Sequence, residues 1–129
     1  MPIHVRWENK EQTIVRLDFV SPVSWEIFQA AIDETVSLVA SVNHRVDILS
    51  IPGEVPMPPG SPAQQVQRAF KKLPPNIGMV VMVTSDDYAR TIVSAVGGVY
   101  LGKRYRAAET VEEACRLIED HRAKASTID

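Results

Sequence analysis

Residues 79–83 read Met-Val-Val-Met-Val, five consecutive apolar side chains that directly follow Gly78. Successive side chains of a strand point to opposite faces, so a strand of this composition needs apolar cover on both faces. That arrangement is typical of a central strand in a parallel sheet, where helices cover each side. The run therefore favours an α/β fold.

The first part of the chain predicts a β-hairpin followed by a helix. Apolar and polar residues alternate at 3–8 and at 14–19, and Asn9 and Lys10 lie in the turn between these runs, which is the pattern of a hairpin. A helix is expected after an N-cap at Ser24, because apolar residues then recur at helical spacing. These residues are Trp25, Phe28, Ile32, Thr35 or Val36, and Val39.

The middle of the chain predicts a strand, an irregular loop and a second helix. Val46–Ile51 is short and rich in β-branched residues, and Pro52-Gly53 ends it, so we expect a buried strand. Residues 52–62 contain five prolines and lack too many amide donors to form helix or sheet interior. A helix is expected from Ser61 until Pro74-Pro75. Its apolar residues are Val66, Ala69, Phe70 and Leu73.

The remainder predicts two more helices and a strand. A third helix is expected after Asp86-Asp87, with Gly97-Gly98 as its C-cap and a flexible turn. Residues 105–108 are expected to form the last strand. Thr110 and Glu113 have the spacing of a capping box, which predicts the start of a final helix.

The predicted element order is ββαβαβαβα. Strands that alternate with amphipathic helices form a mostly parallel sheet, here of about five strands, with the N-terminal β-hairpin at its edge and four helices. A chain of 129 residues has the usual length of one domain. We therefore expect a single domain over residues 1–125 and a frayed tail at 126–129.

Charge and composition bear on the class of partner. The net charge is −2 and the pI is about 5.9, so no overall positive field attracts nucleic acid. The longest apolar run is far shorter than the roughly 20 residues of a membrane-spanning helix. A single cysteine, Cys115, leaves no internal disulfide and no indication of secretion. We expect a cytoplasmic protein without a membrane span.

Several segments together resemble the STAS family, the fold family of anti-sigma-factor antagonists and sulphate transporters, in its stand-alone bacterial form. The resemblance covers nearly the whole chain. The segments that carry it are the opening hairpin, the Ser24-Trp25-Glu26 helix start, the strands Val46–Ile51 and Gly78–Val83, and the Thr110-Val111-Glu112-Glu113-Ala114 helix start. It implies a non-enzymatic regulatory module that binds an unidentified protein partner or forms a homodimer.

The chain departs from this family at Ser61. Classical antagonists carry an Asp-Ser-Ser-Gly-type motif whose serine is phosphorylated, whereas residues 59–62 here read Pro-Gly-Ser-Pro. Ser61 is a candidate modification site, but the favoured interpretation is an N-cap with Pro62 at N1 and Gln64 at N3. The resemblance thus implies a module without the usual phospho-serine switch.

Two binding surfaces are predicted. The first is the proline-rich loop with the helix that follows, because long loops at the ends of strands are common binding sites. Its candidate partner-binding residues are Met57, Ser61, Gln64, Gln65 and Arg68. The alternative is an apolar pocket near Trp25 and Phe28 that holds a small apolar ligand or lipid.

Catalytic and metal chemistry are not predicted, and neither is a cofactor. His4, His44 and His121 are far apart in the sequence, and none has a second ligand at the spacing of a metal site. Cys115 lies on the apolar face of the predicted last helix, where an inert thiol is expected. Asp47 interrupts an apolar strand, so it either faces water or is bonded to a basic neighbour.

Overall fold

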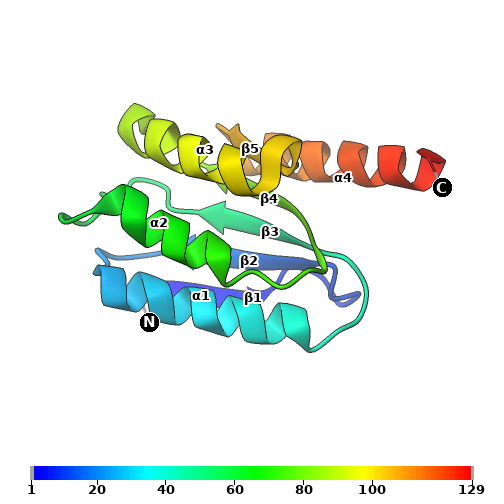
Figure 1. The fold of residues 1–129 in the computed structure, drawn as a ribbon, viewed down its shortest axis with the longest axis horizontal. Helices are drawn as coiled ribbons and strands as arrows, with labels where there is room; N and C mark the ends of the chain where they lie inside the picture. Colours follow the sequence, from blue (N-terminus) through cyan, green and yellow to red (C-terminus); the bar gives the residue numbers. More distant parts are fainter. Residues whose placement is uncertain (1, 129) are drawn as a thin grey trace.

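The computed structural model describes residues 2–128, and side chains through residue 125. Figure 1 shows strands and helices in the order expected from the sequence. The strands are β1 (Ile3–Trp7), β2 (Ile14–Phe19), β3 (Val46–Ile51), β4 (Ile77–Val83) and β5 (Tyr105–Ala108). The helices are α1 (Trp25–Ala40), α2 (Pro62–Lys71), α3 (Asp87–Leu101) and α4 (Val111–Ile128), and a 3-10 turn follows α3 at Gly102–Arg104. The predicted order ββαβαβαβα is confirmed.

The five strands form one sheet in the order β1-β2-β3-β4-β5. β1 and β2 pair antiparallel as a hairpin, with Ile3 opposite Phe19. The other neighbours pair parallel, through registers such as Val15 with Ile48 and Val80 with Tyr105. The sheet is therefore mostly parallel, with the hairpin at one edge, as expected.

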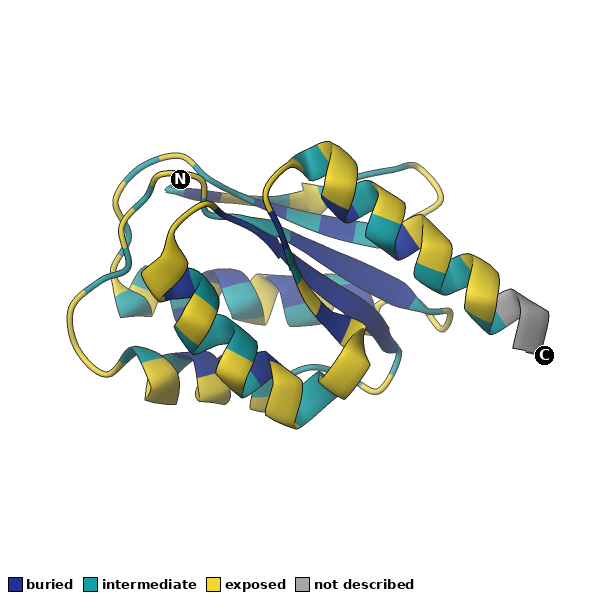
Figure 2. Ribbon diagram, turned by 90° about the horizontal axis from the view of Figure 1, so that it is seen from above, coloured by how far each residue is buried: buried dark blue, intermediate teal, exposed yellow. Residues whose placement is uncertain are grey.

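The helices form two layers around the sheet. Buried side chains of β1–β5 pack with α1, α2 and α3 on one face, and a second cluster packs Leu49, Val81 and Ala108 against Ala114 and Ile118 of α4. Figure 2 shows α4 on the opposite side of the sheet from the other helices. All seven residues of β4 are buried, which confirms the prediction of a central strand covered on both faces.

The end of α3 differs from the sequence prediction. The helix passes through Gly97 and Gly98 and ends at Leu101, where Gly102 adopts a positive φ of 58°. A Cβ atom at Gly97 would lie 2.6 Å from the Tyr105 ring, whereas one at Gly98 would meet nothing within 4 Å. Gly97 therefore allows α3 to approach β5, and the glycine pair is not a C-cap.

The cap of α2 also differs from the prediction. Ser61 occupies the N-cap position with Pro62 after it, but its side chain makes no capping hydrogen bond. Its φ and ψ of −105° and 80° differ from the extended backbone found at Ser24, whose Oγ accepts a hydrogen bond from the Ile27 amide at 3.1 Å. The expected capping box at Ser61 is therefore absent, and the hydroxyl is exposed at the start of the helix. The cap at Thr110 forms, with a 3.1 Å bond from the Glu113 amide.

Asp47 is fully buried and ion-paired. Its Oδ1 accepts hydrogen bonds from Arg45 at 2.9 Å and from the Met79 amide at 2.7 Å, and its Oδ2 accepts one from Arg122 at 2.6 Å. Arg45 Nη2 also contacts Nδ1 of His121, at 2.8 Å. Burial, followed by the positive charge of Arg45, lowers the pKa of His121, so the ring accepts this bond in its neutral form. The network joins α4 to the amino ends of β3 and β4, where the register of these strands shifts.

The tail expected at 126–129 falls on residues whose side chains the structure does not describe. The backbone is described through residue 128, and α4 continues to Ile128. None of the four helices in the described range combines the length and the apolar character that a bilayer-spanning segment requires.

Candidate functional site

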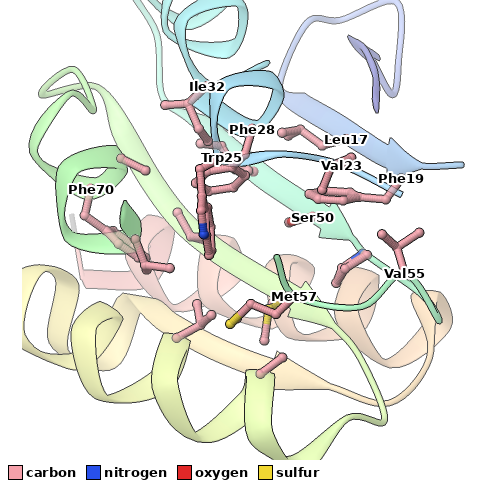
Figure 3. A pocket seen from close by; sticks show the side chains of 18 of the residues that line it. Leu17, Phe19, Val23, Trp25, Phe28, Ile32, Ser50, Val55, Met57 and Phe70 are labelled. Carbon is pink, nitrogen blue, oxygen red and sulfur yellow. The ribbon is translucent and has the colours of Figure 1, made fainter. Parts of the chain in front are cut away.

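A cavity of about 130 Å³ lies between the sheet and helices α1, α2 and α3. Figure 3 shows side chains from strands, helices and the loop after β3 that converge on it. Its lining residues are Leu17, Phe19, Val23, Trp25, Phe28, Ile32, Ile48, Ser50, Pro52, Val55, Pro56, Met57, Pro58, Val66, Ala69, Phe70, Leu73, Val80, Met82, Ala89, Val93 and Tyr105. None of them is charged, so the cavity suits an apolar molecule.

The first turn of α1 forms one wall and holds the proline-rich loop in place. Trp25 and Phe28 meet edge to face, with ring centroids 5.5 Å apart, a favourable aromatic geometry. The indole Nε1 of Trp25 donates a hydrogen bond to the carbonyl of Pro59 at 3.0 Å. At Gly60, where φ is 126°, a Cβ atom would lie 3.3 Å from the same Nε1. The loop is therefore anchored on Trp25, and its residues between Pro52 and Pro58 contribute to one wall of the cavity.

A polar contact fixes α2 against α1. The buried amide of Gln29 donates from Nε2 to the carbonyl oxygen of Gln65 at 2.9 Å and to its Oε1 at 3.1 Å. Lys72 donates to Gln29 Oε1 and to Asp33 Oδ1, each at 2.9 Å. Because the buried amide of Gln29 is satisfied by groups of α2 and of the residue after it, hydrogen bonds hold α2 against α1. The cavity between them is thus part of the folded structure.

An aromatic cluster forms the wall near β5. Phe70 stacks on Tyr100 at 6.1 Å and meets Tyr105 edge to face at 6.0 Å. The Tyr105 hydroxyl is buried and has no hydrogen-bond partner among the described residues. Burial raises the pKa of Tyr105 to about 12, while the nearby Ser94 side chain, which lies beside the hydroxyl without the geometry of a hydrogen bond, and the charge of Arg90 act in the opposite direction. The hydroxyl is therefore neutral at pH 7.

We expect Tyr105→Phe to maintain or raise the stability of the ligand-free protein, by up to about 1–2 kcal/mol, because it removes a buried hydroxyl that lacks a partner. Chemical denaturation of the two proteins measures this change. A loss of more than about 1 kcal/mol would show that the hydroxyl is bonded in solution.

The structure brings three of the predicted site residues together. Trp25, Phe28 and Met57 all line the cavity. Met57 is half-buried and contributes to the cavity wall, although the sequence placed it on a partner-binding surface.

The other predicted residues lie on or beside α2. Ser61, Gln64 and Arg68 are exposed, while Gln65 is bonded to Gln29. They form the outer side of the wall whose inner side is Val66, Ala69 and Phe70.

Ser50 is a lining residue that sequence reasoning missed. It follows Ile48 by two positions in β3, so both residues lie on the same face of the sheet. That spacing was a usable signal. Whether Ser50 lines the cavity depends on which face of the sheet the cavity occupies, and the pattern of the strand alone does not identify that face.

The cavity lining contains no carboxylate, imidazole or thiol, and its polar side chains are the hydroxyls of Ser50 and Tyr105 and the indole of Trp25. Among the residues that the structure describes, no three His, Cys, Asp or Glu side chains are grouped so that they could hold a metal ion. Cys115 is half-buried on α4, on the other face of the sheet, and burial raises the pKa of its thiol.

Comparison with protein-family models, with curated proteins and with solved structures finds no match for this chain. The function proposed below therefore rests on the fold and on the geometry of the cavity.

Proposed function

We propose that this protein is a binding module for a small apolar molecule, held in the cavity between the sheet and helices α1, α2 and α3. The observation that carries the proposal is an uncharged cavity of about 130 Å³, lined by 22 residues. A protein cavity of about 150 Å³ lined by aliphatic and aromatic side chains stays dry and binds benzene. The cavity here has a similar volume and a mostly apolar lining, and it is partly open to solvent.

Its walls support binding because they are held independently of any ligand. The Trp25 bond to Pro59 fixes the loop, and the Gln29 contacts with Gln65 fix α2. A site that is formed before binding does not have to order loops and side chains when the ligand enters. The lining is predominantly apolar, as is usual for a site that binds a small molecule.

Toluene is the probe for this proposal. We expect it to bind with a Kd of roughly 0.1–1 mM, which corresponds to about −4 to −5.5 kcal/mol. Binding to the folded state alone raises the unfolding temperature as toluene is added. Chemical shift changes should concentrate on the amides and methyl groups of the lining residues, such as Ile48, Val66 and Met82.

Ala89→Leu is the blocking variant, because Ala89 lines the cavity from α3 and is 9% exposed. The larger side chain should weaken toluene binding at least tenfold by occupying part of the cavity. Ala95→Leu is the matched control, since Ala95 is exposed on the same helix. A folded Ala89→Leu protein that binds toluene as the Ala95→Leu protein does would contradict the proposed site.

A protein-docking function is the second candidate. It follows from the exposed hydroxyl of Ser61, which makes no cap bond, and from Gln64 and Arg68, which are exposed beside it on α2. This surface adjoins the loop that contributes to one wall of the cavity. The STAS resemblance supports this candidate, with a protein partner or a second copy of the chain as the occupant.

A further inference from the structure

We propose that the cavity selects an electrically neutral molecule of about the size of one aromatic ring, which carries one hydrogen-bonding group directed at Ser50. This inference rests on the proposed function and specifies its ligand class. Three observations carry it: the volume of the cavity, an unpaired hydroxyl inside it, and the charges of the segments that border it.

The volume limits the ligand to a single ring or a short chain. About 130 Å³ is available, slightly less than the roughly 150 Å³ of the cavity that binds benzene. A lipid with two acyl chains is far larger than this space. The ligand is therefore a small molecule, or only the end of a longer one enters.

Ser50 supplies the polar contact. It lies in β3 between Leu17 of β2 and Met82 of β4, which are its partners in the parallel ladder, and both neighbours also line the cavity. Figure 3 shows its oxygen among the apolar side chains of the lining. The side chain makes no hydrogen bond to any residue that the structure describes. Its hydroxyl can both donate and accept, so a ligand hydroxyl, carbonyl or amide would find a partner there.

Charges near the cavity disfavour an anion. Three loops contribute to the lining. Two of them, with the first turn of α1, span residues 19–28 and 51–61, and their charged residues are Glu26 and Glu54. Both are exposed. The third, after α2, contains Lys72, whose Nζ is already bonded to Gln29 and Asp33. The loop after β4 adds Asp86 and Asp87, and the nearby Arg90 already contacts Asp87, Glu109 and the carbonyl of Thr84.

An anionic head group would therefore meet like charges at these segments and find no free cation there. Binding of a cation in the cavity is also disfavoured, because the lining has no acidic residue and a buried charge without a partner is strongly unfavourable. Fatty acids and phosphate-bearing lipids are thus disfavoured by charge, as well as by size. The charges around the cavity therefore favour an electrically neutral ligand.

The test compares toluene, phenol and benzoate at pH 7 on the native protein, on Ser50→Ala and on Ser37→Ala. Ser37 is exposed on α1, so its replacement is the matched control. We expect Ser50→Ala to weaken phenol binding about 3–10-fold, the effect of one hydrogen bond, and to leave toluene binding unchanged. Ser37→Ala should change neither affinity. Benzoate should bind native protein at least tenfold more weakly than phenol.

The outcomes separate this inference from the proposed function. If neither toluene nor phenol binds native protein, the proposed function is wrong. If toluene binds, the proposed function is supported. If benzoate then binds as tightly as phenol, or if Ser50→Ala does not weaken phenol binding, the inferred ligand class is wrong. The benzoate comparison uses native protein only, so it holds even if a variant fails to fold.

Discussion

Replacing Asp47 with alanine is expected to lower the free energy of unfolding by about 3–5 kcal/mol. Asp47 is fully buried between Arg45 and Arg122, and its carboxylate also accepts the Met79 amide. Its removal takes the counter-charge from two partly exposed arginines and the acceptor from the buried Met79 amide, and breaking a buried ion pair by removing one partner is strongly destabilising. Urea denaturation followed by circular dichroism measures the change.

Asp18→Ala is the control for this prediction. Asp18 pairs with Arg16 at 2.9 Å and with Arg6 at 3.5 Å on the solvent-accessible hairpin, where its side chain is 23% exposed. Both side chains of the pair with Arg16 are partly exposed, so its loss is expected to cost about 1 kcal/mol, less than the loss of the fully buried carboxylate. Asp47→Asn adds a finer comparison, since it keeps an oxygen for the Met79 amide while removing the charge. Equal losses for Asp47→Ala and Asp18→Ala would mean that the buried network contributes no more than a surface pair.

The neighbouring glycines of α3 are expected to respond in opposite directions to the same substitution. Gly97→Ala places a methyl group 2.6 Å from the Tyr105 ring, and overpacking of this kind costs about 1–3 kcal/mol. Gly98→Ala meets nothing within 4 Å. Alanine at a helical position without a clash stabilises by about 0.5–1 kcal/mol relative to glycine.

Thermal and chemical denaturation of the two alanine variants provide the measurement. Because the substitution and the helix are the same, helix propensity cancels, and the remaining difference of about 1–3 kcal/mol reports the contact with Tyr105. Equal stabilisation of both variants would show that the Tyr105 ring moves away at no cost.

The sequence was sufficient to predict the fold because its patterns agree with one another. The alternation in residues 3–8 and 14–19 belongs to a hairpin with unequal faces, and the apolar run at 79–83 belongs to a strand that is buried on both sides. The helices each carry an apolar stripe at the correct spacing. Local patterns that agree with the tertiary arrangement are what sequence reasoning can detect.

The two errors concern residues whose role is set by tertiary contacts. Gly97 and Gly98 have the composition of a helix end, but Gly97 is required by the approach of Tyr105, a residue of another element. The positive φ that ends the helix is at Gly102. Ser61 has the correct neighbours for a cap, yet its backbone angles do not direct the hydroxyl to an amide.

The candidate site was predictable only in part. Trp25 and Phe28 were identified because they lie in one helix. Asp47, which lies outside the cavity, was recognised as a residue that needs a partner. Arg45, two residues away, was a detectable partner, whereas Arg122 is 75 positions distant. The rest of the lining comes from four strands, three helices and three loops, so its prediction requires the topology of the sheet.

The bond between Asp47 and Arg122 also has a consequence for the folding of the chain during synthesis. β3 carries its carboxylate into the sheet long before the ribosome has added Arg122. Until α4 emerges and docks, this charge retains only its partner Arg45, and the face that α4 covers remains open to water. The nascent sheet is therefore expected to gain its full stability late, as one cooperative step with the last helix, and to depend on protection from aggregation until then.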